Sequence, residues 1–330
     1  VSEVLNADDR PPFHRWRLAA RSLLDIHPRR REASAENVAR ERMLTVMSSN
    51  AETKARADAG ETLGRLGDPR DLKAFVPIPA GTYNLSMGEV EIETPFEIGK
   101  YPVTNGWFRE FVAAGGYENT DLWTPEGRKW LAHTKAKAPA GWHDRKWNNP
   151  SAPVVGVCWW EAAAFLEWLT RSRDDGWRYG LPSEIQWEAA AAGKEGKGKY
   201  PWRGDWAEDH CNSSEGGLGK TSVVGVFPKG DTPERVVDLS GNVWEWLETD
   251  YHSREMKSDY PFDEEVQALY DAGEYLKAVG KYEKNNGINP MLRGGGWSLT
   301  RSLVARASRS RNYPDQRDDY MGFRAARTLS

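Results

Sequence analysis

The sequence predicts an α+β fold in which a small helical segment precedes a larger domain with few regular strands. Residues 1–72 are rich in Arg, Ala and Glu and contain a single Trp. After residue 72 the chain breaks into short β-like runs separated by Gly and Pro. The 16 Trp residues fall mostly in this second part. Because a buried Trp covers ~150–250 Å², we expect these side chains to hold together a domain with little regular sheet.

The composition indicates a soluble globular protein and excludes several classes of function. Of 330 residues, 39% are hydrophobic and 28% charged, with a net charge of −4, which argues against a disordered chain and against a nucleic-acid binder. No run approaches the ~18 apolar residues of a membrane helix. Cys158 and Cys211 are the only cysteines, which fits a reducing, cytoplasmic location. No P-loop or dinucleotide fingerprint occurs, so we expect no nucleotide.

The N-terminal segment, 1–72, reads as three helices, over 13–27, 37–47 and 51–66. Gly67 is placed as a helix C-terminal glycine that stops the last of them. The segment is interpreted either as the end of a helical repeat or as a linker. Because the chain begins with Val rather than Met, we expect an effector domain upstream.

Helices are also expected within the second part of the chain. One covers 105–113 and begins after Thr104, a good N-cap, and another covers 159–173. A third covers 183–192, where Ser183 and Gln186 have the spacing of a capping box. Residues 251–290 are acidic and Tyr-rich and read as an insertion.

Nine segments after residue 72 occur in the order typical of one known family. Together they resemble the formylglycine-generating-enzyme / sulfatase-modifying-factor domain, whose fold is a variant of the C-type lectin fold. The segments are FVPIPAGTYNLSMG (75–88), FEIGKYPVTNGWFREFV (96–112), APVVGVCWWEAAAFLEWL (152–169), YGLPSEIQWEAAAAG (179–193), YPWRGDW (200–206), CNSSEGGLGKTSVVGVFP (211–228), VVDLSGNVWEWLETD (236–250), LRGGGW (292–297) and MGFRAAR (321–327). The resemblance implies a C-type-lectin-like domain over 73–330.

The family's oxidase chemistry does not transfer to this chain. Its enzymes oxidise a substrate cysteine with copper held by two Cys, and counting back from the GFR motif places those positions at Arg301 and Arg306. A guanidinium stays protonated and is no copper ligand, so we expect no copper and no catalysis. A related iron-dependent branch uses three His in an N-terminal helical domain, where this chain has only His14 and His27.

Two short loops have the oxygen-rich composition that Ca²⁺ prefers. The resemblance implies structural Ca²⁺ sites there, although both loops also read as plain tight turns. The implied ligands are Asn212, Ser213, Gly216 and Leu218 in the first loop and Ser240, Gly241, Val243 and Glu245 in the second.

Residues 297–322 alternate an Arg, Gly, Trp and Phe framework with small polar clusters. This pattern resembles variable proteins of diversity-generating retroelements, in which adenines of Asn codons are randomised. Every cluster residue is reachable from an Asn codon, and Tyr, Ser, Asn and Asp are common in binding faces. The predicted face consists of Ser298, Leu299, Thr300, Ser302, Leu303, Ser310, Asn312, Tyr313, Asp318, Asp319 and Tyr320. Arg317 and Arg324 are expected to be structural.

The leading hypothesis is therefore a non-catalytic display protein whose C-terminal face, diversified by a retroelement, binds a protein partner. One alternative is a fixed-specificity sensing module of a larger signalling or conflict protein. A metal-dependent oxidase is the disfavoured alternative, because Arg301 and Arg306 replace the copper ligands.

Overall fold

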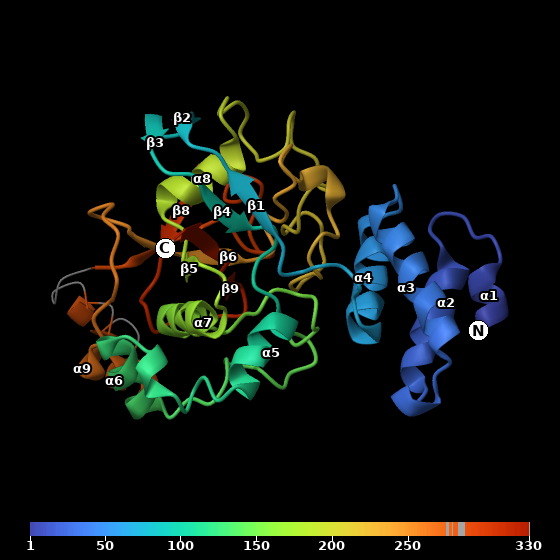
Figure 1. Cartoon of the computed structure of the whole chain (residues 1–330), viewed down its shortest axis with the longest axis horizontal. Helices are drawn as coiled ribbons and strands as arrows, with labels where there is room; N and C mark the ends of the chain where they lie inside the picture. Colours follow the sequence, from blue (N-terminus) through green and yellow to red (C-terminus); the bar gives the residue numbers. More distant parts are fainter. Residues whose placement is uncertain (275–276, 279, 283–287, 330) are drawn as a thin grey trace.

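The computed structural model describes residues 1–274, 277–278, 280–282 and 288–329. A group of N-terminal helices packs at one end of a larger domain built from short strands, helices and long irregular segments (Figure 1). This arrangement has the α+β character that the sequence predicts. Among the described residues, no helix combines the length and the apolar character needed to cross a bilayer.

The N-terminal helices share an apolar core with the larger domain. Their bounds are Ser2–Asn6 (α1), His14–Ser22 (α2), Ala33–Ser48 (α3) and Thr53–Leu66 (α4). Their buried faces meet Val223, Val226 and Phe227 of an irregular loop. Arg56 of α4 is fully buried and donates to the carbonyl oxygens of Val226 (3.0 Å) and Asp209 (3.1 Å). The segment is therefore packed onto the larger domain.

Short strands form two small sheets and a hairpin within the described chain. The first sheet has the order β1-β4-β10-β5 and is antiparallel. The second has the order β8-β7-β6-β9, with β6 parallel to β9, and β2 pairs with β3. The strands are Phe75–Ile78 (β1), Gly81–Leu85 (β2), Gly88–Ile92 (β3), Phe96–Gly99 (β4), Trp177–Gly180 (β5), Trp244–Asp250 (β6), Pro290–Arg293 (β7), Arg309–Arg311 (β8), Met321–Gly322 (β9) and Ala326–Leu329 (β10).

Local sequence signals set several helix ends. Gly67, with φ +93°, ends α4. The Thr104 hydroxyl accepts from the Trp107 amide (3.3 Å) and begins α5. The reciprocal capping box of Ser183 and Gln186 begins α8. These three predictions are confirmed. The helices of the larger domain are Asn105–Ala113 (α5), Pro125–Thr134 (α6), Trp159–Ser172 (α7), Glu184–Ala192 (α8) and Glu264–Asp271 (α9).

The core of the larger domain is aromatic, as the Trp content predicts. Phe165 of α7 packs against Phe108 and Phe323, with ring centroids 5.3 and 5.5 Å apart. The buried indole of Trp246 donates to the Val157 carbonyl (3.0 Å), so its polar group is satisfied. These contacts join segments that are distant in sequence and place the C-terminal residues beside α5 and α7.

The predicted insertion, 251–290, lies partly outside the described residues, which omit 275–276, 279 and 283–287. Its described part contains α9, next to α6 (Figure 1). The Phe262 ring packs near His133 (5.6 Å) and Trp160 (5.8 Å), so this part of the insertion is attached to the core.

Candidate functional site

None of the eleven side chains predicted to form a binding face is fully buried. The exposed ones are Ser298, Thr300, Ser302, Leu303 and Asp319. The half-buried ones are Leu299, Ser310, Asn312, Tyr313, Asp318 and Tyr320. The interleaved framework side chains of Val304, Arg306 and Phe323 are buried. Four of the five exposed residues lie within 298–303, here called the display loop.

The display loop rests on the first predicted calcium loop. The Ser214 amide donates to the Leu299 carbonyl (2.9 Å), and the Arg301 amide donates to Glu215 Oε1 (2.8 Å). The Tyr200 hydroxyl donates to the Arg301 carbonyl (3.1 Å). The shape of the display loop therefore depends on these two neighbouring segments.

Two Trp side chains border the predicted face. The Trp297 indole donates to the Asp319 carbonyl (3.2 Å), and its ring centroid lies 5.9 Å from that of Trp147. The Lys146 ammonium lies over both rings, 4.3 Å from Trp147 and 5.7 Å from Trp297. Both rings are half-buried. Sequence reasoning missed Trp147, although the aromatic segment at 141–147 was a usable signal.

Two tyrosines of the predicted face are held by internal contacts. The Tyr313 ring lies 4.3 Å from the ring of Tyr282, which belongs to the insertion. The Tyr320 hydroxyl donates to Asp318 Oδ2 (2.9 Å). Burial and the Asp318 charge raise the pKa of Tyr320 to about 12, so this hydroxyl stays neutral. Because of these contacts, the two tyrosine rings give their part of the predicted face a fixed shape.

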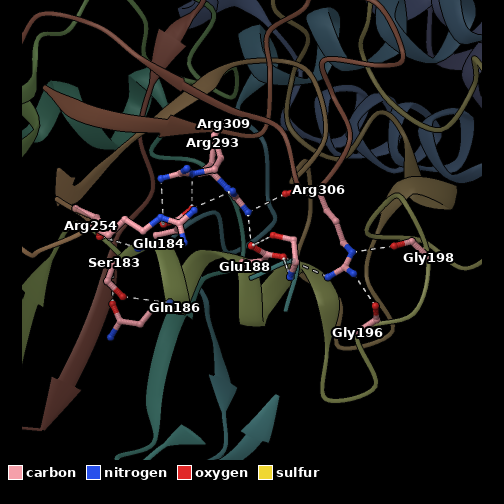
Figure 2. Close-up of polar contacts among 12 residues, drawn as sticks. Ser183, Glu184, Gln186, Glu188, Gly196, Gly198, Arg254, Arg293, Arg306 and Arg309 are labelled. Atoms are coloured by element: carbon pink, nitrogen blue, oxygen red, sulfur yellow. Dashed lines mark hydrogen bonds and ion pairs between the residues drawn. The ribbon is translucent and has the colours of Figure 1, made fainter. Parts of the chain in front are cut away.

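A buried ion-pair cluster joins the C-terminal segment to α8 (Figure 2). Glu188 pairs with Arg293 (2.7 Å) and Arg306 (3.5 Å), and Glu184 pairs with Arg309 (2.7 Å). Burial lowers the pKa of Arg293, and the two glutamates oppose that effect. Because unpaired buried charges are costly, the cluster holds the framework arginines in place.

The two positions expected to replace the copper cysteines have different environments. Arg301 is exposed on the display loop. Arg306 is buried and, besides Glu188, binds the carbonyl oxygens of Gly198 (2.8 Å) and Gly196 (2.6 Å). Its guanidinium therefore has a structural role.

The structural roles expected for Arg317 and Arg324 are confirmed. Arg317 pairs with the buried carboxylate of Glu161 (3.0 Å). Arg324 is fully buried and binds both carboxylate oxygens of Glu245 (2.6 and 2.7 Å).

The first calcium loop has side-chain chemistry that fits a hard cation. Asn212 Oδ1, Ser213 Oγ and Thr221 Oγ1 are buried and have no hydrogen-bond partner among the described residues. Unsatisfied buried oxygens are uncommon in folded proteins, and Ca²⁺ takes such oxygens as ligands. The Gly216 and Leu218 backbones, the other implied ligands, lie in the same loop and are half-buried.

The second calcium loop fits less well. Glu245 accepts from Arg324 and from the Trp187 indole (2.7 Å), and the Ser240 hydroxyl donates to the Val304 carbonyl (2.6 Å). The Glu245 carboxylate therefore belongs to a core ion pair, and its role as a calcium ligand stays a prediction. The remaining implied ligands are the backbones of Gly241 and Val243, which hydrogen-bond to each other (2.8 Å).

Comparisons with known proteins identify the domain. Residues 65–329 match the family model of the sulfatase-modifying factor enzyme 1-like domain. Hercynine oxygenase of Mycolicibacterium thermoresistibile is 28% identical over 244 residues, covering 70% of this chain and 50% of that protein. The formylglycine-generating enzyme of Thermomonospora curvata is 27% identical over 311 residues, covering 77% of this chain and 93% of that protein. The chain thus spans about half the length of the first relative.

Solved structures show the same fold. PvdO from Pseudomonas aeruginosa matches with a TM-score of 0.54 and 23% identity, covering 77% of this chain and 94% of that one. Treponema denticola variable protein 1 matches with a TM-score of 0.51 and 19% identity, covering 76% and 94%. The predicted C-type-lectin-like fold of this family is therefore confirmed.

Proposed function

The chain belongs to the family of sulfatase-modifying factor enzyme 1-like domains, and on this premise we propose that it is a non-catalytic ligand-binding protein. Its C-terminal face, 297–322, binds a protein partner, and a retroelement diversifies the exposed positions. The observation that carries the proposal is that all eleven Asn-codon-reachable side chains are exposed or half-buried, whereas framework residues such as Val304 and Arg306 are buried. Surface substitutions usually change stability by less than ~0.5 kcal/mol, so such a face accepts new residues without unfolding.

The chemistry of the face supports binding to a protein. The display loop offers hydroxyl groups and one exposed apolar side chain, Leu303, which is 49% exposed. Trp297 and Trp147 provide rigid aromatic surface at its border, and Trp is enriched among residues that dominate binding energy.

The environment of Arg306 supports the non-catalytic part of the proposal. At this position a guanidinium stands where the oxidases have a copper-binding thiolate, so the site lacks that soft ligand. The guanidinium is bonded to Glu188 and to two carbonyl oxygens. The enzyme names of the relatives describe those proteins. Hercynine oxygenase also contains a further half that this chain does not match.

We further propose that Ca²⁺ binds the first calcium loop and stiffens the display loop. Asn212 and Ser213 would supply the side-chain oxygens, together with backbone carbonyls. Because Ser214 and Glu215 of this loop bond directly to the display loop, a bound cation would limit its movement. A stiffer loop loses less conformational entropy when a partner binds.

The genomic test needs only the DNA around the gene. A near-copy of the codons for 297–322, differing only at adenines and accompanied by a reverse-transcriptase gene, is the expected finding. If no such copy exists, the proposal that a retroelement diversifies this face is wrong. The fixed-specificity sensing module then becomes the better account, because it needs no sequence variation.

The binding test uses a photo-crosslinking amino acid. Placed at Ser302, it is expected to trap a discrete protein partner in the source cells. The control places the same amino acid at Glu89, which is exposed on β3, and should trap nothing discrete. Equal cross-linking at the two positions would show that the C-terminal face is not the binding surface.

A further inference from the structure

A cavity of about 560 Å³ opens between α7, β5, β10 and the residues that follow β6. Its apolar wall includes Trp123, Trp159, Leu166 and Leu181, all buried. The Trp159 indole N–H is already bonded to the Leu247 carbonyl (2.9 Å), so this side chain offers the cavity only its ring. The volume lies in the range of small-molecule sites, ~300–1,000 Å³. None of the eleven residues of the predicted face lines the cavity.

Most charged side chains at this cavity are already neutralised by partners. Each of three cations has a carboxylate within 3 Å, and the pairs are Arg171 with Glu167 (2.6 Å), Lys257 with Glu255 (2.8 Å) and Arg327 with Glu97 (2.6 Å). Arg327 is additionally packed on the ring of Trp177 (4.4 Å). These groups are therefore not available to bind a ligand without losing an existing contact.

Two side chains of opposite charge line the cavity without a partner. Glu248 lies on β6 and is half-buried, and Arg178 lies on β5 and is exposed. Within the described residues, neither side chain has a hydrogen bond or an ion pair, so they are farther apart than the ~4 Å of a salt bridge. Burial raises the pKa of Glu248, and the charge of Arg178 opposes that rise. One further carboxylate that lines the cavity, Asp121, is exposed and has no ion pair within the described residues.

We propose that this cavity binds a free α-amino acid with an apolar side chain. The ammonium group of the ligand donates to Glu248, its carboxylate accepts from Arg178, and its side chain lies against Trp159 and the neighbouring leucines. This site is separate from the protein-binding face, so the inference does not rest on the proposed function.

The class of ligand follows from the two unpaired charges. A purely anionic ligand would satisfy Arg178 but would bring a second negative charge close to Glu248. A purely cationic ligand would satisfy Glu248 but would bring a second positive charge close to Arg178. An α-amino acid carries both charges two bonds apart, so one molecule neutralises both side chains with charge-assisted hydrogen bonds. The apolar wall then favours an apolar side chain, because its burial is favourable.

The test begins with the full chain and the twenty standard L-amino acids. Thermal unfolding is measured with each at 10 mM, and at least one apolar amino acid is expected to raise Tm by ~2 °C or more. Calorimetric titration of the best one gives the reference affinity. The N-acetyl and methyl-ester derivatives, which each remove one charge, are expected to bind at least ~10-fold more weakly.

Variants then locate the site. Glu248→Gln and Arg178→Gln are each expected to weaken binding at least ~10-fold with little change in the Tm of the unliganded protein. Arg171→Gln is the matched control, since this arginine also lines the cavity and is exposed but is paired with Glu167. This variant should change affinity less than ~3-fold. The proposal is overturned if no amino acid raises Tm, or if the two site variants bind as tightly as the control.

Discussion

Replacing Glu245 with Gln is expected to destabilise the protein strongly. Its carboxylate and the Arg324 guanidinium are both fully buried and joined by two bonds, of 2.6 and 2.7 Å. Arg324 also donates to the carbonyl oxygens of Gly99 (2.8 Å) and Val237 (3.0 Å). Glutamine keeps the shape of the side chain but removes the negative charge that is bonded to the buried guanidinium.

The size of the effect follows from this burial. Breaking a buried ion pair by removing one partner typically costs ~3–5 kcal/mol. Unfolding entropies of ~2.1 cal/mol/K per residue give ~0.7 kcal/mol/K for a chain of this length. The Tm of the Glu245→Gln variant should therefore fall by ~4–7 °C, and urea unfolding should show a corresponding loss of free energy.

The matched control is Glu167→Gln. Glu167 pairs with Arg171 at 2.6 Å, but the two side chains are 42% and 52% exposed. Exposed helix pairs of this spacing are worth ~0.3–0.5 kcal/mol, so Tm should change by less than ~1 °C. If both variants lose similar stability, the argument that burial decides the strength of these pairs is wrong.

Three further predictions concern pH, the helical segment and calcium. Burial, followed by the charge of Asp238, raises the pKa of Asp231 to about 7. The Asp231 carboxyl therefore binds its proton more tightly in the folded protein than in the unfolded chain. As a result, the free energy of unfolding falls as pH rises from ~4 to ~7. Asp231→Asn should raise Tm at pH 8 but not at pH 4. Equal changes in Tm at the two pH values would show that the charge of Asp231 is not the cause. Arg56→Ala should lower the free energy of unfolding, measured with urea, by ~2–4 kcal/mol because it leaves buried carbonyls without donors. The control Arg15→Ala, at an exposed position, should lower it by less than ~0.5 kcal/mol. Chelation with EGTA should lower Tm, and added Ca²⁺ should restore it. In the Asn212→Ala variant, Tm should be the same with EGTA and with Ca²⁺. A Tm of the unmodified protein that EGTA does not change would argue against calcium binding in this loop.

The sequence by itself determined the fold class, the family and several local structures. Thr104 and Ser183 begin helices because their hydroxyl groups accept from nearby backbone amides. Gly67 ends α4 because its backbone adopts a positive φ angle. Such signals act over a few residues, so they can be read directly from the chain.

The tertiary structure decided which distant side chains meet. Arg306 reaches Glu188, 118 residues away, and Arg324 reaches Glu245, 79 residues away. The local motif around Glu245 does not show that Arg324 faces its carboxylate. Trp147 was missed for the same reason, since its place beside Trp297 depends on how two separate loops pack. Pairings of this kind depend on strand register and core packing, which arise only when the whole chain has folded.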